Sequence, residues 1–292
     1  MNDEARSPLL RGCAPLSPRY PVWFCDVWGV VHDGLRADED ACEALMRHRE
    51  NGGIVIFITN SPRPRAALID QLDGLKVPRE AWDDIVTSGD VTRAAVARHA
   101  GSKVFHLGPE KDARLREGLP VAFTTGRDAD VVLCSGLYDD QNETPEDYRE
   151  MLSALAARGL PMICANPDLK VMHGGRIIPC AGALAEIYAG LGGEVLLAGK
   201  PHAPIYEECL KRAERAAGRK VKRAEILAIG DGLGTDILGA RDFGVAALYI
   251  AGGVHHEELA AGGVAAIVAR IEEVAPGVDL AGIMEHLVWE EK

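Results

Sequence analysis

The chain has 292 residues, of which 47% are hydrophobic and 26% charged, the composition of a globular protein with core enough for one large or two ordinary domains. Its formal net charge of −12 argues against nonspecific binding to nucleic acid or to an anionic membrane, because the field of the protein repels both. No apolar run has the length of a membrane span and none follows the acidic amino terminus, so we expect no signal peptide and a cytoplasmic protein.

Seven cysteines are spread along the chain, an odd number without a C-x-x-C pair. This usage fits a reducing compartment, in which cysteines serve as small apolar residues of the core. It agrees with the cytoplasmic location expected from the rest of the composition.

The first hundred residues alternate between strand and helix patterns. A stretch over 1–19, rich in Pro, Arg and Ser, predicts a loose arm. The elements predicted after it are strands at 22–27, 54–58 and 85–87 and helices at 37–51, 65–75 and 91–100. The continuous β-branched run at 54–58 indicates a strand buried on both faces. A βαβαβα alternation implies a parallel sheet with right-handed crossovers.

The last hundred residues have the same character, and the middle forms a region of its own. The predicted elements of the tail are strands at 194–198, 226–229 and 245–250 and helices at 203–217 and 235–242. Those of the middle are strands at 104–107, 131–134 and 162–164 and helices at 145–158 and 181–189. We therefore predict a Rossmann-like α/β core with a parallel sheet, formed by 1–102 and 193–292, and a second α/β domain inserted at 103–192.

Four polar motifs each follow a predicted strand. They are Asp26, Thr59-Asn60-Ser61, Gly199-Lys200-Pro201 and the glycine-rich acidic loop Gly230–Asp236. Open α/β sheets bind ligands at the carboxyl ends of their strands, so these motifs are candidate site residues. The carboxylates Asp231 and Asp236 suit a hard cation such as Mg²⁺. Their alternative roles are purely structural, as a helix cap and as a first-turn acid.

Taken together, the four motifs predict chemistry on a phosphoryl group. A carboxylate such as Asp26 can act as a nucleophile and form an aspartyl-phosphate. Mg²⁺ and the compact charge of Lys200 would neutralise the phosphate. The hydroxyl and amide groups of Thr59, Asn60 and Ser61 would orient its oxygens.

The order of these motifs resembles the haloacid dehalogenase superfamily, and within it the class IIA or NagD-type phosphatases. The stretches that carry the resemblance are Thr59-Asn60-Ser61, Thr87-Ser88-Gly89-Asp90, Asn166-Pro167-Asp168, Gly199-Lys200-Pro201 and Gly230–Asp236. The resemblance covers nearly the whole chain. The predicted insertion lies between the second and third superfamily motifs, which is the place of the class II cap domain.

This resemblance implies a role for each candidate residue. Asp26 would be the nucleophile, Thr59 the phosphate-binding hydroxyl and Lys200 the charge-neutralising lysine. The Mg²⁺ ligands would be Asp26, the backbone carbonyl of Trp28 and Asp231, with Asp236 as a further ligand or as an acid next to the ligands. The residues facing phosphate and substrate would include Asn60, Ser61, Asn166 and Asp168. The implied substrate is a small phosphorylated metabolite, such as a sugar phosphate. Caps of this branch often supply a dimer surface, which makes a homodimer through the cap a candidate assembly.

The first motif departs from the superfamily pattern. Phosphatases of this superfamily carry Asp-x-Asp, in which the second Asp protonates the leaving group and then activates water; here that position is Trp28. An indole N–H is not a general acid at neutral pH, and a positioned acid–base group typically contributes ~10²–10⁴-fold. His32, four residues further on, is a candidate replacement. Three functions stay open: a phosphatase that favours good leaving groups, a non-catalytic phosphometabolite-binding protein, and cleavage of a bond other than P–O.

Overall fold

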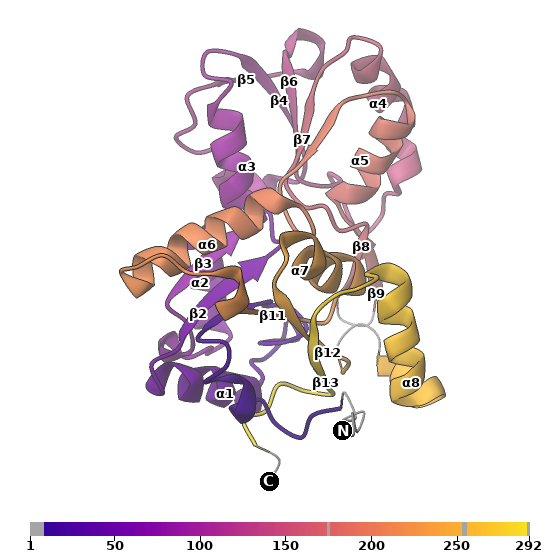
Figure 1. Cartoon of the computed structure of the whole chain (residues 1–292). Helices are drawn as coiled ribbons and strands as arrows, with labels where there is room; N and C mark the ends of the chain where they lie inside the picture. Colours follow the sequence, from indigo (N-terminus) through magenta and orange to yellow (C-terminus); the bar gives the residue numbers. More distant parts are fainter. Residues whose placement is uncertain (1–8, 174–175, 253–255, 291–292) are drawn as a thin grey trace. The chain divides into compact units, whose positions relative to one another are not determined.

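The computed structural model describes residues 9–173, 176–252 and 256–290. Its backbone contacts divide the chain into two compact units. The core unit comprises residues 1–58, 71–85 and 206–292, and the inserted unit comprises residues 59–70 and 86–205. Each unit contains a parallel sheet with helices packed beside it (Figure 1), so the predicted α/β class is confirmed.

The sheet of the core unit has six strands in the order β13-β12-β11-β1-β2-β3. Their bounds are β1 Val22–Cys25, β2 Ile54–Thr59, β3 Asp84–Thr87, β11 Ile226–Gly230, β12 Ala246–Ile250 and β13 Leu280–Met284. The chain builds outward from β1 to β3 on one side and from β11 to β13 on the other. The order therefore reverses between β1 and β11, and such a switch point is where open α/β sheets bind their ligands.

Four helices belong wholly or mainly to the core unit, and a fifth, α2 Arg65–Gly74, is divided between the two units. The four are α1 Glu39–Glu50, α6 Ala203–Ala217, α7 Leu238–Phe243 and α8 His256–Val274. Local chemistry explains where α1 begins: Asp38 accepts a hydrogen bond from the N–H of Ala41 at 2.9 Å, and two acids occupy its first turn. Short 3₁₀ helices at Ala14–Leu16, Arg79–Ala81 and Arg223–Glu225 connect the larger elements.

The inserted unit has a five-stranded parallel sheet in the order β10-β7-β6-β4-β5 and a separate antiparallel pair, β8-β9. The strands are β4 Lys103–Leu107, β5 Ala122–Thr124, β6 Val131–Cys134, β7 Met162–Cys164, β8 Lys170–His173, β9 Arg176–Pro179 and β10 Val195–Leu197. The helices are α3 Ser88–Ala97, α4 Arg149–Ala156 and α5 Ala181–Gly190, and 3₁₀ helices span Glu110–Leu115, Gly126–Asp128 and Pro145–Tyr148.

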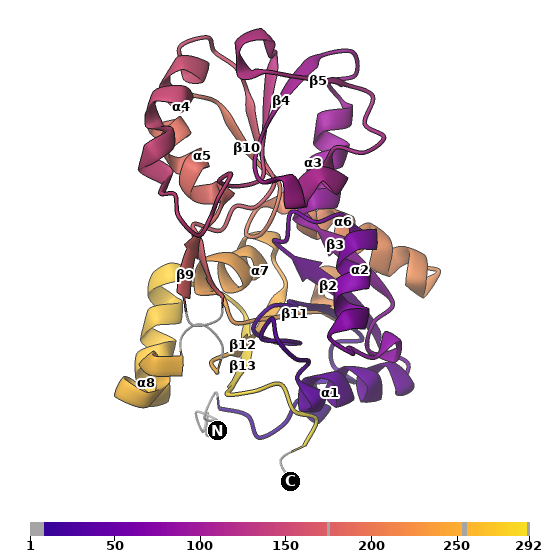
Figure 2. The same ribbon diagram turned by 180° about the vertical axis from the view of Figure 1, so that it is seen from behind.

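Both faces of this second sheet are covered by helices. Val131 and Leu133 of β6 pack in the cluster that contains α3, whereas Val132 and Cys134 pack in the cluster that contains α4 and α5. Figures 1 and 2 show α3 on one side of the sheet and α4 and α5 on the other. The continuous apolar sequence of β6 is therefore explained by burial on both faces.

The boundaries of the inserted unit differ from the predicted 103–192. Helix α3 belongs to this unit because Ala95 and Val96 pack against its strands, and residues 59–70 and the segment up to 205 join it as well. The predicted arm also differs over its described part, 9–19. Cys13 and Leu16 are buried there, and the N–H of Cys13 donates to the carbonyl of Val288 at 2.9 Å. Residues 1–8 lie outside the described residues.

Apart from the short 3₁₀ helices, four strands and one α-helix were not predicted: β5, β8, β9, β13 and α8. Strand β5 is only three residues long, and α8 is broken at Gly263, whose φ of +63° interrupts any long helical period. The pair β8-β9 had a usable signal, since two apolar-rich runs flank the sequence Gly174-Gly175.

Two further sequence expectations concern the helices and the cysteines. Within the described residues, no helix combines the length and the apolar character needed to cross a membrane. All seven cysteines are buried with free thiols, as expected for core residues.

A buried histidine generates a prediction about stability. The ring of His48 stacks on Trp23 with centroids 3.7 Å apart, and its Nδ1 lies 2.8 Å from the hydroxyl of Ser17. Burial lowers the pKa of His48 from 6.5 to about 4, so the unfolded chain takes up a proton before the folded protein does. Its contribution to stability is therefore fully present above pH 6.5 and is lost as the pH falls toward 4. We expect the free energy of unfolding to lose about 2 kcal/mol from this group between neutral pH and a pH near 5.

Urea unfolding of the wild type and of His48→Gln at both pH values measures this contribution. The variant should be less stable at neutral pH but should show the smaller pH dependence. Equal pH dependence in the two proteins would exclude His48 as the titrating group.

Candidate functional site

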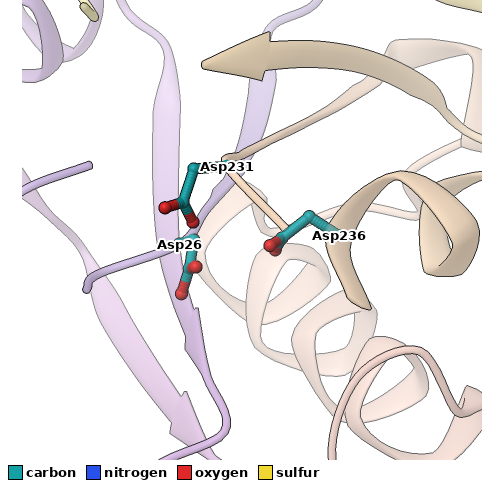
Figure 3. A group of neighbouring side chains, drawn as sticks. All are labelled: Asp26, Asp231 and Asp236. Atoms are coloured by element: carbon teal, nitrogen blue, oxygen red, sulfur yellow. The ribbon is translucent and has the colours of Figure 1, made fainter. Parts of the chain in front are cut away.

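Three buried carboxylates meet at the switch point of the core sheet. Asp26 follows β1, Asp231 follows β11, and Asp236 lies in the turn that leads into α7. An oxygen of each lies within 4.8 Å of an oxygen of the other two. Figure 3 shows the carboxylate groups of the three residues gathered around one point. The sequence predicted these three acids as a set, and the structure brings them together.

Glycines make this close approach possible. Gly29 has a φ of +86°, and a Cβ at this position would lie 2.3 Å from Oδ2 of Asp231. A Cβ at Gly230 would lie 2.2 Å from Cγ of Asp236, and one at Gly232 would lie 2.0 Å from the hydroxyl of Thr235. The glycine-rich sequence is therefore required by the space that the acids occupy, as well as by the turn.

The acidic loop is held in place by hydrogen bonds to its own backbone. The carboxylate of Asp236 accepts from the N–H of Gly232 at 3.1 Å and from the hydroxyl of Thr235 at 3.2 Å. Residues Leu233–Ile237 form one π-helical turn, a local distortion that is frequent at functional sites. Asp26 is oriented similarly, since its Oδ1 accepts from the N–H of Val27 at 2.7 Å.

The donor set fits a divalent cation. Three carboxylates this close repel one another unless a positive charge lies among them. Mg²⁺ prefers oxygen ligands and is usually bound through a small number of carboxylates together with water. The aspartates Asp26, Asp231 and Asp236 could therefore hold such an ion.

Trp28 and His32 pack against each other beside the first motif. Their rings meet edge to face with centroids 5.1 Å apart, and the indole lies over Gly34, where a Cβ would come within 2.5 Å of it. The N–H of Gly34 donates to Nδ1 of His32 at 3.0 Å. Burial lowers the pKa of His32 to about 4, so at neutral pH the ring is uncharged and carries its proton on Nε2. In this geometry the Nε2–H of His32 is the hydrogen-bond donor of the ring.

In the inserted unit, Asn60 connects the second and third motifs. Its Oδ1 accepts from the N–H of Lys200 at 2.7 Å, and its Nδ2 donates to the carbonyl of Lys200 at 3.2 Å and to Asp168 at 2.8 Å. A Cβ on Gly199 would lie 2.3 Å from the same Oδ1. The side-chain amide of Asn60 was expected to contact phosphate. In the structure its Nδ2 and its Oδ1 instead form these hydrogen bonds within the protein. Asn60 is therefore a residue that positions Lys200.

The other predicted residues of the second and cap motifs are also tied to the backbone. The hydroxyl of Thr59, at the carboxyl end of β2, accepts from the N–H of Ser61 at 3.2 Å. The hydroxyl of Ser61 accepts from the N–H of Arg63 at 3.3 Å. Asn166 accepts from the N–H of Asp168 at 3.0 Å, so the Asn-Pro-Asp sequence is a locked turn. Lys200 is 2% exposed.

Comparison with known proteins identifies the family. A model described as haloacid dehalogenase-like hydrolase matches residues 23–119, and a second, HAD-hydrolase-like model matches residues 197–278. A solved structure of a haloacid dehalogenase-like hydrolase from Brucella suis 1330 is 49% identical, with a TM-score of 0.82, over 85% of this chain and 92% of that one. The chain belongs to the haloacid dehalogenase-like hydrolases.

Two curated proteins place it more closely within the family. It is 26% identical to the 5'-nucleotidase YutF of Bacillus subtilis (strain 168), over 82% of this chain and 90% of that protein. It is 27% identical to the ribonucleotide monophosphatase NagD of Escherichia coli (strain K12), over 79% of this chain and 87% of that protein. The resemblance to the NagD-type branch is thereby confirmed.

The contact between Gly29 and Asp231 generates a prediction about cation binding. In Gly29→Ala, the added methyl group would displace the Asp231 carboxylate from its partners, so we expect at least a tenfold weaker Mn²⁺ affinity, measured by titration calorimetry. Gly52→Ala is the matched control, because Gly52 has a similar φ of +84° but nothing within 4 Å of its Cβ position. Equal Mn²⁺ affinities in the two variants would contradict a site that includes Asp231.

Proposed function

We propose that the protein is a Mg²⁺-dependent phosphatase that hydrolyses a small phosphorylated metabolite through an aspartyl-phosphate on Asp26. The observation that carries this proposal is the convergence of Asp26, Asp231 and Asp236 at the switch point of the core sheet. Membership of a hydrolase family and similarity to a nucleotidase and a nucleotide monophosphatase support it.

In the first step, a carboxylate oxygen of Asp26 attacks phosphorus and the ester oxygen leaves. The hydrogen bond from the N–H of Val27 fixes the rotation of this carboxylate before the attack. The bound cation would lower the charge repulsion between the carboxylate and the phosphate. By family resemblance, the Trp28 carbonyl would be a further ligand of the cation, and Thr59 and Lys200 would bind phosphate oxygens.

Asn60 prepares Lys200 for this role. The side-chain amide of Asn60 accepts one hydrogen bond from the backbone of Lys200 and donates another to it. These two bonds fix the loop from which the lysine side chain extends. A positioned charge costs no reorganisation when the phosphate arrives, which is the usual origin of electrostatic catalysis. In the second step, water attacks phosphorus, the P–O bond to Asp26 breaks, and the inorganic phosphate formed keeps the proton that the water loses.

The replacement of the second acid by Trp28 limits the substrates. Neither the indole of Trp28 nor the neutral ring of His32 can protonate a leaving oxygen at neutral pH. Aryl and acyl phosphates, whose leaving groups need little protonation, should therefore react much faster than alkyl phosphates. His32 can still contribute as a donor through Nε2, either to a phosphate oxygen or to water.

The main test is an assay of p-nitrophenyl phosphate with and without Mg²⁺. Turnover should require the cation and should fall at least 10³-fold in Asp26→Asn, because the nucleophile is lost. The control is Asp73→Asn, which removes an exposed carboxylate of the same unit and should retain full activity.

The same assay separates the enzyme from a non-catalytic binding protein, the candidate favoured by the loss of the second acid. Binding of Mn²⁺ and inorganic phosphate without turnover of any ester would reject the phosphatase and support that alternative.

Restoring the second acid generates a further prediction. Trp28→Asp should raise the turnover of an alkyl phosphate by about 10²-fold or more, with a smaller gain for p-nitrophenyl phosphate, because activation of water helps both substrates whereas protonation of the leaving group helps only the alkoxide. Trp28→Phe is the control that removes the indole without adding an acid. If Trp28→Asp and Trp28→Phe have the same ratio of the two activities, the missing acid does not limit the rate.

A further inference from the structure

A buried tyrosine of the core unit contacts the acidic loop from behind. Tyr206, on α6, is 1% exposed, and its hydroxyl lies 3.4 Å from the backbone carbonyl of Thr235 and 3.4 Å from that of Asp236. Both carbonyls belong to the π-helical turn Leu233–Ile237. Because Asp236 is one of the three carboxylates of the candidate cation site, the tyrosine contacts the backbone of a proposed cation ligand.

The π-helical turn is held only weakly by its own backbone. The N–H groups of Asp236 and Ile237 both donate to the carbonyl of Gly232, at 2.8 and 3.1 Å. Because these two donors share one acceptor, the turn contains fewer separate hydrogen bonds than an α-helical turn of the same length, and turns of this kind are rare. A contact from outside the turn therefore has a large influence on how its carbonyls, and the side chains of the same residues, are oriented.

The face of α7 that follows the turn admits the tyrosine hydroxyl. A Cβ on Gly239 would lie 2.2 Å from the hydroxyl oxygen of Tyr206, so any larger residue would displace it. Phe243 lies one helical turn beyond Gly239 on the same face, and its ring stacks on that of Tyr206 with centroids 5.3 Å apart. The ring is thus packed on Phe243, and the hydroxyl reaches the carbonyls through the space that the glycine leaves.

Helix α6 is itself fixed to the core sheet. Arg212 donates to Asp84, the first residue of β3, at 3.0 Å and to Glu208 of its own helix at 3.0 Å. These bonds fix the position of α6 and hence of Tyr206. A phenylalanine would fill the same buried space without the cost of burying a hydroxyl, and a buried tyrosine hydroxyl is normally retained where it has a hydrogen-bond partner. The backbone of the acidic loop supplies that partner.

We propose that Tyr206 is a positioning residue for the cation site. Its hydroxyl holds the backbone of Asp236 so that the carboxylate of this residue lies beside those of Asp26 and Asp231. The proposal rests on the cation site of the proposed function, and it concerns binding of the cation, not turnover. Groups that orient metal ligands without touching the metal commonly contribute about 10- to 100-fold to metal affinity.

The first test is the Mn²⁺ affinity of Tyr206→Phe, measured by the electron paramagnetic resonance signal of free Mn²⁺. The variant keeps the stacked ring and loses only the hydroxyl, so we expect about tenfold weaker binding. Tyr20→Phe is the matched control and should bind Mn²⁺ like the wild type. Tyr20 is 3% exposed in the same unit, and its hydroxyl has no hydrogen-bond partner within the described part of the chain.

A second measurement distinguishes positioning of the ligand from a general role in packing. In the background Asp236→Asn, Tyr206→Phe should change the Mn²⁺ affinity by less than about twofold, because the carboxylate that the tyrosine positions is already lost. An equal loss of affinity in both backgrounds would overturn the proposal. So would a Tyr206→Phe variant that is less stable in urea without the cation but binds Mn²⁺ like the wild type.

The outcomes distinguish this proposal from the proposed function. Absence of Mn²⁺ binding by the wild type rejects the cation site and the proposal with it. Equal Mn²⁺ affinities of the wild type and Tyr206→Phe overturn the role of Tyr206 alone. Mn²⁺ binding without turnover of any ester rejects the phosphatase but leaves the comparison of affinities valid. If circular dichroism shows that Tyr206→Phe is unfolded, Gly239→Ala, whose methyl group would displace the same hydroxyl, takes its place.

Discussion

Mutual repulsion among three buried carboxylates is the constraint on which the site depends. Asp26, Asp231 and Asp236 are brought within 4.8 Å of one another by the ends of two adjacent parallel strands and the turn that follows them. Glycines at 29, 230 and 232 leave no side chain between them. Three carboxylate ligands at this spacing suit a divalent cation, and the proposed metal-dependent chemistry rests on that arrangement.

In the first motif, Trp28 stands where the family pattern has a second Asp, and this replacement affects cation binding and proton transfer differently. Trp28 leaves the carboxylate cluster intact but removes the acid that relatives with Asp-x-Asp would use. Its indole packs against His32 and over Gly34. The ring of His32 is kept neutral by burial and has its Nδ1 occupied by the backbone. The local structure therefore stabilises the loop, and under the proposed mechanism the lost acid favours substrates with good leaving groups.

The two units use the same topological rule. In each, strand order reverses beside the first strand of the sheet, and in each the polar side chains stand at the carboxyl ends next to that reversal. In the inserted unit, the side-chain amide of Asn60 is hydrogen-bonded both to the backbone of Lys200 and to the carboxylate of Asp168.

The sequence by itself determined the α/β class, the strands that carry the motifs and the identity of the three acids, because buried parallel strands are continuous apolar runs and polar residues at their ends are conspicuous. It did not reveal that Asn60 binds the backbone of Lys200, 140 positions away, or that α3 belongs to the inserted unit. Those features arise from contacts between distant parts of the chain, and only the tertiary structure decides which side chains meet.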